Sequence, residues 1–372
     1  MQADHPSRMP FIDALKAICC LLIVAHHLAI YGPMSDIAYP LIPALMEWLR
    51  EYGRIAVQMF FVIAGFLSAA KLAPQGLSLV TTPIRLIRQR YLRLIMPYLA
   101  ALTLAIGCAA LARVWMNHAS IPGTPHLFQL LTHIFLLHDL LNQEVLSAGI
   151  WFVAIDFQLY ALTILVLWIS NRIQNHYSGL HMQKILSLIL ILSLTVASLF
   201  FFNRDPYWDE TALYFFGSYG LGMLIYWVSV SHYRFLGFIV LIALTFTALT
   251  IDFRPRIAVA GSIMLILGLA QYYSVLESKF VPGCLAYLGR TSYSIFLVHF
   301  PISLVINAAF FNFLPHHPVI HLFGLLSAIC TSIGGGILLF RWLEARPVNK
   351  RMRILLPTGF ITCGLLAMLV NG

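Results

Sequence analysis

The first apolar stretch of the chain, residues 11–31, contains residue types that could transfer a proton. Lys16 and His27 are eleven positions apart, so at about 100° per residue they fall on one face of a helix. Asp13 lies near that face and three positions from Lys16, which allows an ion pair. An ionisable group in such a stretch costs roughly 2.5–3.5 kcal/mol in a membrane, which makes it a functional candidate. His27 could act as a base, because an ordinary histidine has a pKa of about 6.5; alternatively, it only bonds to a neighbouring helix.

A second polar face occurs in residues 150–170, where Asp156, Tyr160 and Thr163 follow at intervals of four and three. Counted from the same membrane surface, Asp156 and His27 are expected at similar depths. The two residues could therefore form a general base and its orienting carboxylate. The alternative is a lone carboxylate held by a tyrosine or an amide.

A third set of polar residues occurs in residues 285–308. Ser292, His299 and Ser303 are expected on one face of this stretch, and Pro301 is expected to kink it. His299 falls in the outer half of its stretch, as His27 does. Taken alone, such a histidine more often packs in the interior than takes part in catalysis.

Four arginines in the cytoplasmic loop expected before the third apolar stretch form two pairs spaced three residues apart, Arg85 with Arg88 and Arg90 with Arg93. At helical spacing both members of a pair share one face, and two guanidinium groups suit a polyphosphate. The alternative is a cluster that binds lipid headgroups and fixes the orientation of the chain.

No metal is expected, because the histidines of the outer loops and span ends match no standard ligand spacing. The sequence also contains no G-x-S-x-G, Walker or H-E-x-x-H motif. Hydrolase, nucleotidase and zinc-protease functions therefore lack support.

The composition defines the elements that must hold these residues. Of 372 residues, 60% are hydrophobic and only 10% are charged, whereas soluble domains carry roughly 25% charged residues. This excludes a soluble enzyme, a disordered chain, a disulfide-stapled secreted domain and a nucleic-acid-binding domain. The net charge of +9 is explained by basic residues collected in cytoplasmic loops.

Eleven stretches approach the length of about 20 apolar residues that a membrane helix needs. They predict an all-α, polytopic transmembrane bundle of about 10–11 spans. The stretches are 11–31, 53–73, 92–116, 150–170, 184–202, 211–230, 235–251, 256–273, 285–308, 319–340 and 354–371. The shorter apolar stretch 127–141 contains two histidines and an aspartate, and we expect an interfacial or re-entrant segment there.

Lysine and arginine fall mainly on one side of these spans, which sets the orientation by the positive-inside rule. With a cytoplasmic N-terminus, 17 of them lie on the cytoplasmic side and 6 on the other. We therefore expect this orientation, in a multi-pass protein of the inner (plasma) membrane, with the C-terminus outside. Asp13, Lys16, His26 and His27 within the first span argue against a cleaved signal peptide.

An ordered set of segments resembles the membrane acyltransferase 3 family, bacterial enzymes similar to the O-acetylases of surface polysaccharides. The segments are RMPFIDALKAICCLLIVAHH at 8–27, GRIAVQMFFVIAGFL at 53–67, RYLRLIMPY at 90–98, WFVAIDFQLY at 151–160, LGRTSYSIFLVHFP at 288–301 and RWLEARP at 341–347. Counted from Asp13, the family's functional histidine falls on His27 and not on His26. The chain has Lys16 where the family usually has arginine, Asp156 where glutamate is common, and Ala64 where serine is usual.

This resemblance implies transfer of an acyl group, most often acetyl from acetyl-CoA, to a carbohydrate hydroxyl. It assigns catalysis to His27 as general base, with Asp156 beside it, and donor binding to Arg90, Arg93 and Lys16. The residues expected to bind substrate are Tyr160, Ser292, His299 and Trp151. The implied partners are acyl-CoA, a carbohydrate or lipid-linked glycan acceptor and membrane lipids, with no nucleic acid. Residues 1–350 would form the ten-helix acyltransferase domain, and residues 351–372 an extra C-terminal transmembrane helix.

Two alternatives stay open at this point. The acyl group could pass directly to the acceptor, which we favour, or through an acyl-histidine intermediate. The chain could instead be a secondary transporter or flippase for a glycan or lipid-linked sugar. Transporters of this kind often show broken helices in two repeated halves, and the sequence shows no such repeat.

Overall fold

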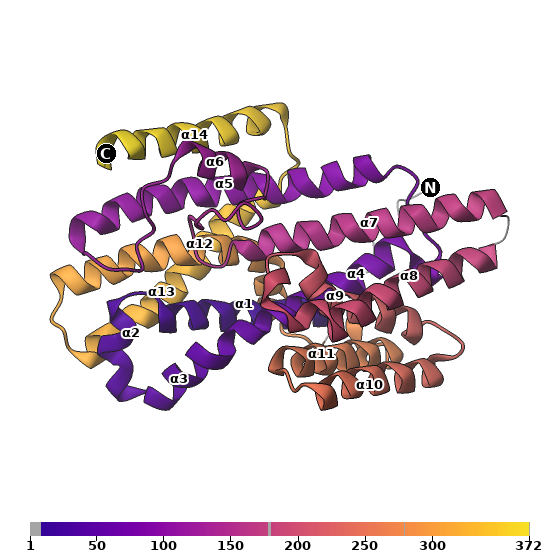
Figure 1. Ribbon diagram of the computed structural model, residues 1–372. Helices are drawn as coiled ribbons and strands as arrows, with labels where there is room; N and C mark the ends of the chain where they lie inside the picture. Colours follow the sequence, from indigo (N-terminus) through magenta and orange to yellow (C-terminus); the bar gives the residue numbers. More distant parts are fainter. Residues whose placement is uncertain (1–8, 178–179, 279, 372) are drawn as a thin grey trace. The chain divides into compact units, whose positions relative to one another are not determined.

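The computed structural model describes residues 9–177, 180–278 and 280–371, and the described residues form helices joined by loops (Figure 1). Eleven helices in this part of the chain are long and apolar enough to cross a membrane. The prediction of an all-α, polytopic membrane protein is therefore confirmed.

In chain order the helices are α1 (Pro10–Ile30), α2 (Pro33–Ala38), α3 (Pro43–Tyr52), α4 (Ala56–Leu72), α5 (Pro83–Trp115), α6 (Leu127–Ile134), α7 (Trp151–Tyr177), α8 (Leu180–Phe200), α9 (Ala212–Ser229), α10 (Arg234–Ile251), α11 (Pro255–Tyr272), α12 (Gly283–Phe313), α13 (Pro318–Leu339) and α14 (Lys350–Asn371). A π-helical turn, Phe340–Glu344, directly follows α13.

Helix α5 is longer than the predicted span 92–116, because it begins at Pro83 and has 33 residues. At 1.5 Å per residue this is about 50 Å, against a hydrocarbon core of about 30 Å. Proline is favoured at a first helical position, where its missing N–H would have no partner. The segment that carries the four arginines is thus the first part of a helix and not a loop before it.

The stretch 127–141 does not cross the membrane. Its helix, α6, has only 8 residues, or roughly 12 Å of rise, and irregular backbone follows as far as α7. The side chain of His126 accepts a hydrogen bond from the Gln129 amide and forms a capping box. This agrees with the expectation of a short, non-spanning segment.

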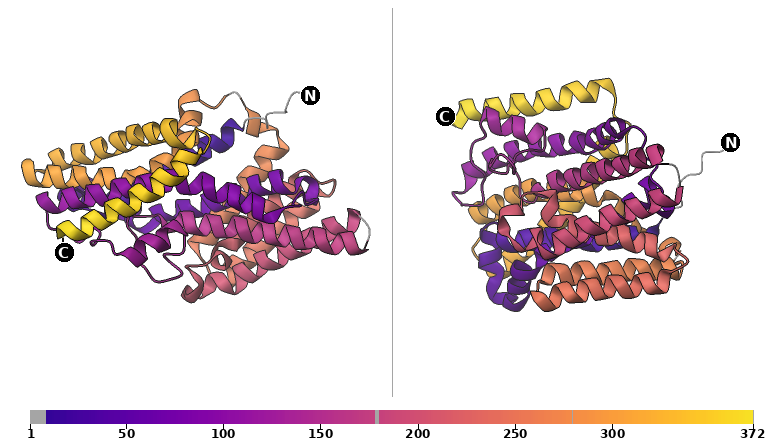
Figure 2. Two further views of the ribbon diagram at one scale, coloured as in Figure 1. Left: turned by 90° about the horizontal axis from the view of Figure 1, so that it is seen from above. Right: turned by 45° about the vertical axis from the view of Figure 1, so that its right-hand side comes forward.

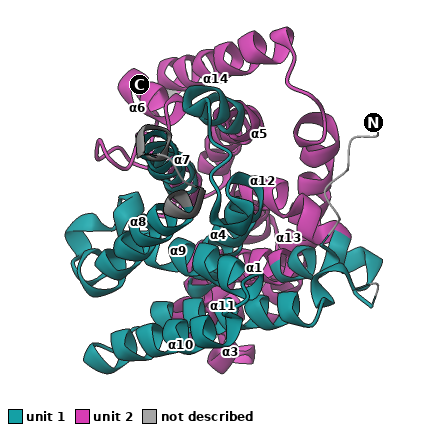
Figure 3. Ribbon diagram, turned by 90° about the vertical axis from the view of Figure 1, so that its right-hand side faces the viewer, with its two compact units in different colours: residues 1–15, 55–90, 155–286 teal, residues 16–54, 91–154, 287–372 magenta. Residues whose placement is uncertain are grey.

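The chain divides into two compact units, coloured separately in Figure 3. Unit 1 consists of Met1–Leu15, Ile55–Arg90 and Ile155–Ala286, and unit 2 consists of Lys16–Arg54, Tyr91–Ala154 and Tyr287–Gly372.

Unit 1 is organised around α9, which is mostly buried and contacts α4, α8, α10 and α11. The backbones of α4 and α9 approach closely, because a Cβ on Gly65 would overlap the Tyr219 carbonyl and one on Gly222 would overlap that of Val62. Small residues at helix interfaces allow such packing inside membranes. Helices α10 and α11 lie side by side and both pack on α9, and α11 also packs on α4 (Figures 1 and 2).

Unit 2 is built around α12 and the later part of α5. Their contact is an apolar cluster that includes Ala109, Ala112, Phe300 and Leu304. Helix α13 packs on α2, and α14 packs on α6. The last helix begins at Lys350, one residue before the predicted extra helix, and most of its surface is exposed.

Candidate active site

Two histidines that are 272 residues apart in sequence meet in unit 2. The Nδ1 atom of His27 on α1 lies 2.7 Å from the Nε2 atom of His299 on α12. The two rings are nearly parallel, with an interplanar angle of 11° and centroids 4.9 Å apart. His299 is fully buried, and His27 is half-buried. Both had been singled out from their places in apolar stretches, but the sequence did not predict their contact.

The hydrogen bonds of this pair determine which nitrogen of each neutral ring carries the proton. The Nδ1 atom of His299 lies 2.5 Å from the Phe296 carbonyl oxygen, which can only accept. His299 Nδ1 therefore donates, so its Nε2 presents a lone pair to His27. The Nδ1 of His27 must then donate as well, which leaves the lone pair of His27 on Nε2. This is the arrangement of a general base whose orientation is held by a second residue.

Space beside the His27 ring depends on Gly149, in the loop before α7. Its φ is +81°, a conformation that other residues rarely adopt, and a Cβ at this position would lie 2.8 Å from His27 Cε1. Cε1 is the ring carbon between the two nitrogens. The Tyr31 ring contacts the same imidazole edge-on, with centroids 5.6 Å apart. Only glycine therefore fits at position 149 without displacing the His27 ring.

The neighbouring His26 has a different environment. Its Nδ1 lies 2.7 Å from the Leu49 carbonyl oxygen and donates to it. The ring also packs against Gly53, just after α3. His26 is buried and fastens α3 to α1, so its role is structural, and His27 is the candidate for chemistry.

A cation lies close to the base. Arg54 stacks on the ring of Trp151, the first residue of α7, with 5.2 Å between the guanidinium carbon and the ring centroid. Arg54 is also near enough to His27 for their charges to interact. The sequence did not single out Arg54. The available signal was an arginine on the side of the membrane where the positive-inside rule expects few.

Asp156 has a different partner from the one expected. Its carboxylate accepts from Arg90 Nη2 at 2.5 Å, within unit 1. The Arg90 guanidinium carbon also lies 5.3 Å from the centroid of the Tyr160 ring. The sequence predicted Asp156 near the outer surface, level with His27, and Arg90 on the cytoplasmic side. These two predictions need correction, because the ion pair places Asp156 and Arg90 at the same depth. In the structure, His299 and not Asp156 bonds to the Nδ1 of His27.

The remaining predicted site residues lie in unit 2. The backbone carbonyl of Ser292 on α12 accepts from the Cys20 thiol at 3.3 Å, and the Ser292 side chain is buried. Lys16 and Arg93 both lie close enough to Glu344 to interact electrostatically with it. In the described part of the chain, no three His, Cys, Asp or Glu side chains are grouped so that they could hold a metal ion.

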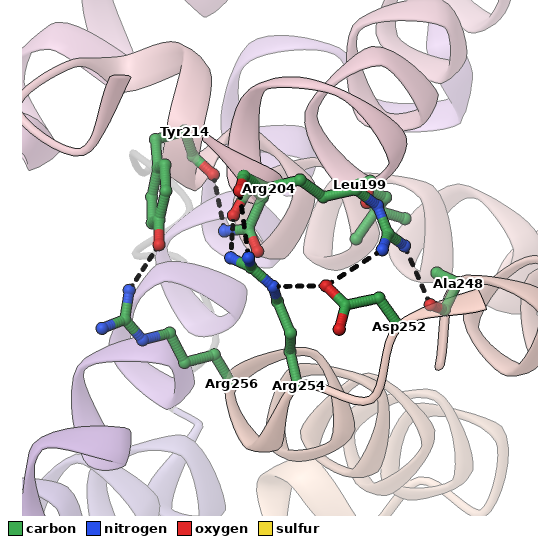
Figure 4. A network of polar contacts seen from close by, with 8 residues as sticks. Leu199, Arg204, Tyr214, Ala248, Asp252, Arg254 and Arg256 are labelled. Atoms are coloured by element: carbon green, nitrogen blue, oxygen red, sulfur yellow. Dashed lines mark hydrogen bonds and ion pairs between the residues drawn. The ribbon is translucent and has the colours of Figure 1, made fainter. Parts of the chain in front are cut away.

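A second polar network joins helix ends in unit 1 (Figure 4). Asp252 lies 3.1 Å from Arg204 Nη1 and 2.8 Å from Arg254 Nε. The other donors of these two arginines end on the backbone carbonyls of Leu199, Asn203, Arg204 and Ala248. Arg256 donates to the Tyr214 hydroxyl at 2.6 Å. Since the nitrogens of Arg204 and Arg254 are already bonded, the network holds helices together and does not form an anion site.

The described part of the chain has eleven helices of membrane-spanning length, which define a multi-pass membrane protein. The bond between two imidazoles leaves His27 Nε2 as a candidate base. Residues 9–341 match the model of a family described as an acyltransferase domain. The chain therefore belongs to this family, the membrane acyltransferase 3 family, and is a membrane acyltransferase. Comparison with curated proteins gives no match, and comparison with solved structures gives none either.

Proposed function

We propose that the protein transfers an acyl group, acetyl as the first candidate, from cytoplasmic acyl-CoA to a hydroxyl of a carbohydrate or lipid-linked glycan in the inner (plasma) membrane. The observation that carries this proposal is the bond between His27 and His299. It leaves His27 Nε2 as the acceptor for a proton, which is what an attacking hydroxyl must lose.

The proposed reaction is a direct transfer. His27 Nε2 takes the proton of the acceptor hydroxyl while its oxygen attacks the thioester carbonyl. The tetrahedral intermediate then expels the CoA thiolate, which takes the proton from the imidazolium. An ester and free CoA thiol result, and His27 is neutral again. During the step His299 accepts from the Nδ1–H of His27 and so stabilises the imidazolium.

The anionic oxygen of the tetrahedral intermediate needs a positive group or hydrogen-bond donors. Arg54 supports this part of the proposal, because its charge interacts with His27 and its position is held by Trp151. Trp151 in unit 2 offers an aromatic face on which a sugar ring could lie, and Tyr160 in unit 1 offers another. We keep both as substrate-binding candidates, while His299 becomes a positioning residue.

The donor site is proposed to include Lys16, Arg90 and Arg93, which would pair with the CoA phosphates. Asp156 supports Arg90 through their ion pair. Ser292 stays a substrate-binding candidate from the sequence, although its side chain is buried.

The proposal is tested by replacing His27 with alanine. Purified wild-type and His27→Ala proteins are reconstituted in vesicles with radiolabelled acetyl-CoA and a glycan acceptor. In parallel, the ester content of surface glycans is measured by mass spectrometry in cells that produce either protein. We expect His27→Ala to stay monodisperse and to lose ester formation, while His232→Ala, an exposed histidine, keeps it. Unchanged ester formation in His27→Ala would refute the proposed base.

A further inference from the structure

Three consecutive residues of α12 each hold a different element of unit 2. These bonds run from Cys20 Sγ on α1 to the Ser292 carbonyl at 3.3 Å, from the Tyr293 hydroxyl to the Leu94 carbonyl on α5 at 2.9 Å, and from the Ser294 hydroxyl to Glu344 Oε2 at 2.6 Å. The parts of α1, α5 and the π-helical turn that they fix therefore lie at one level along α12.

Two cations predicted to bind the donor lie at this same level. Lys16 precedes Cys20 on α1 by about one helical turn, and Arg93 directly precedes Leu94 on α5. The charges of both interact with the Glu344 carboxylate. Glu344 is thus a half-buried acidic group next to Lys16 and Arg93.

The π-helical turn explains how Glu344 reaches this place. In Phe340–Glu344 the backbone closes with a wider spacing, from the Ala345 amide to the Phe340 carbonyl at 2.8 Å. Such turns are rare in proteins, and those that occur often lie at functional sites. The wider turn rotates a side chain away from its ordinary helical direction. Ser294 then fixes one carboxylate oxygen.

We propose that Glu344 is a positioning residue for the acyl donor: it holds the Lys16 ammonium and the Arg93 guanidinium in the arrangement that receives the donor's phosphates. This inference rests on the proposed function. Lysine and arginine side chains are long and lose much rotational freedom when they are fixed, and two neighbouring cations repel each other. A carboxylate held in place by Ser294 reduces both costs before the donor arrives.

The sign of the effect separates this role from simple repulsion. If Glu344 acted only through its negative charge, it would repel the phosphates, and its removal would improve donor binding. If it positions the two cations, its removal weakens donor binding although a negative charge has been taken away.

The experiment compares Glu344→Gln, Ser294→Ala and the control Glu277→Gln, which removes an exposed carboxylate from the side also assigned to the cytoplasm. Steady-state kinetics with acetyl-CoA gives KM and kcat, and titration with coenzyme A alone gives the dissociation constant. For Glu344→Gln we expect KM and the dissociation constant to rise about tenfold, because the two cations lose the charge that orients them; tenfold corresponds to about 1.4 kcal/mol. We expect kcat to change little, Ser294→Ala to show a smaller rise, and Glu277→Gln to match the wild type.

An unchanged or lower KM in a monodisperse Glu344→Gln protein would overturn the inference. If that variant does not fold, Ser294→Ala provides the test, because it keeps the Glu344 carboxylate and removes only the hydroxyl that donates to it. An unchanged KM in Ser294→Ala would then overturn the positioning role. A wild-type protein that neither binds coenzyme A nor transfers an acyl group would overturn the proposed function, and the donor site with it. Wild-type binding with unchanged variants would refute the role of Glu344 alone.

Discussion

His27 donates its Nδ1–H to the Nε2 of His299 over 2.7 Å, and this one bond sets which nitrogen of His27 is basic. In many enzymes a carboxylate accepts the Nδ1–H of a catalytic histidine and holds the ring in one tautomer. Here the imidazole of His299 is the acceptor, and its own orientation is fixed by the Phe296 carbonyl. The basic nitrogen of His27 thus depends on a chain of two imidazoles that ends on the backbone.

The first prediction concerns His299. Replacing it with leucine removes the acceptor of the His27 Nδ1–H, so His27 can adopt the wrong tautomer. We expect kcat to fall about 100-fold, within the usual range for general-base catalysis, with little change in the KM of the donor. His299→Gln offers an amide oxygen to the same N–H and should restore part of the loss. Equal activity of the leucine and glutamine variants would show that His299 acts only by packing.

Gly149 provides a second prediction. Gly149→Ala places a methyl group 2.8 Å from His27 Cε1 and strains a backbone with φ of +81°. We expect the His27 ring to shift and kcat to fall at least about tenfold, since small displacements of a base are costly. Gly107→Ala is the matched control, because a Cβ there meets nothing within 4 Å. It should keep activity and raise stability slightly. Full activity in Gly149→Ala would contradict the tight fit.

The third prediction tests what Asp156 does. Asp156→Asn leaves Arg90 without its carboxylate, which we expect to cost about 3 kcal/mol of stability and to raise the KM of the donor. Arg90→Gln should have a similar effect on KM, and the double variant should be no worse than either single variant, because the two residues act as one pair. A loss of kcat at unchanged KM in Asp156→Asn would restore the catalytic role that the sequence suggested.

A fourth prediction concerns pH. His133 and His138 stack beside each other in the segment around α6, with centroids 4.3 Å apart. Burial lowers the pKa of His133 to about 4, and burial together with His133 lowers the pKa of His138 to about 3. Asp139 lies 3.3 Å from His138 Nε2, and the pKa of His138 is nevertheless lowered.

In the unfolded chain both histidines titrate near 6.5. Above that pH they are neutral in both states and have no effect on stability. As the pH falls from about 6.5 towards 4, only the unfolded segment gains protons, so the fold loses up to about 1.4 kcal/mol per histidine and pH unit. The protection factors of the amides in residues 127–148 against hydrogen exchange, corrected for the intrinsic effect of pH, should therefore fall over this range. The double variant His133→Gln and His138→Gln should flatten the profile, and exchange equally pH-dependent in both proteins would refute this cause.

The sequence predicted most of the helices and the candidate histidine, because the signals for both are local. Helix existence follows from apolar length, and the choice of His27 over His26 follows from the resemblance to the family motif that begins at Asp13. The contact with His299 spans 272 residues and depends on how α1 and α12 pack, which no spacing encodes. The pairing of Arg90 with Asp156 was missed for the same reason, and because α5 begins at Pro83 and not at 92. In the sequence, Glu344 appears only as part of the motif at 341–347. Its role could not be predicted, because the direction of its side chain depends on a π-helical turn.

In the network of Figure 4, most guanidinium N–H groups donate to backbone carbonyl oxygens. Peptide oxygens do not titrate, and bonds to them are weakened by salt less than an exposed ion pair is. The bonds that Arg204 and Arg254 make to peptide oxygens should therefore depend little on acidity and salt, whereas their ion pairs with the exposed Asp252 depend on both. Helix ends joined through peptide oxygens stay joined when the acidity or the salt content of the surroundings changes.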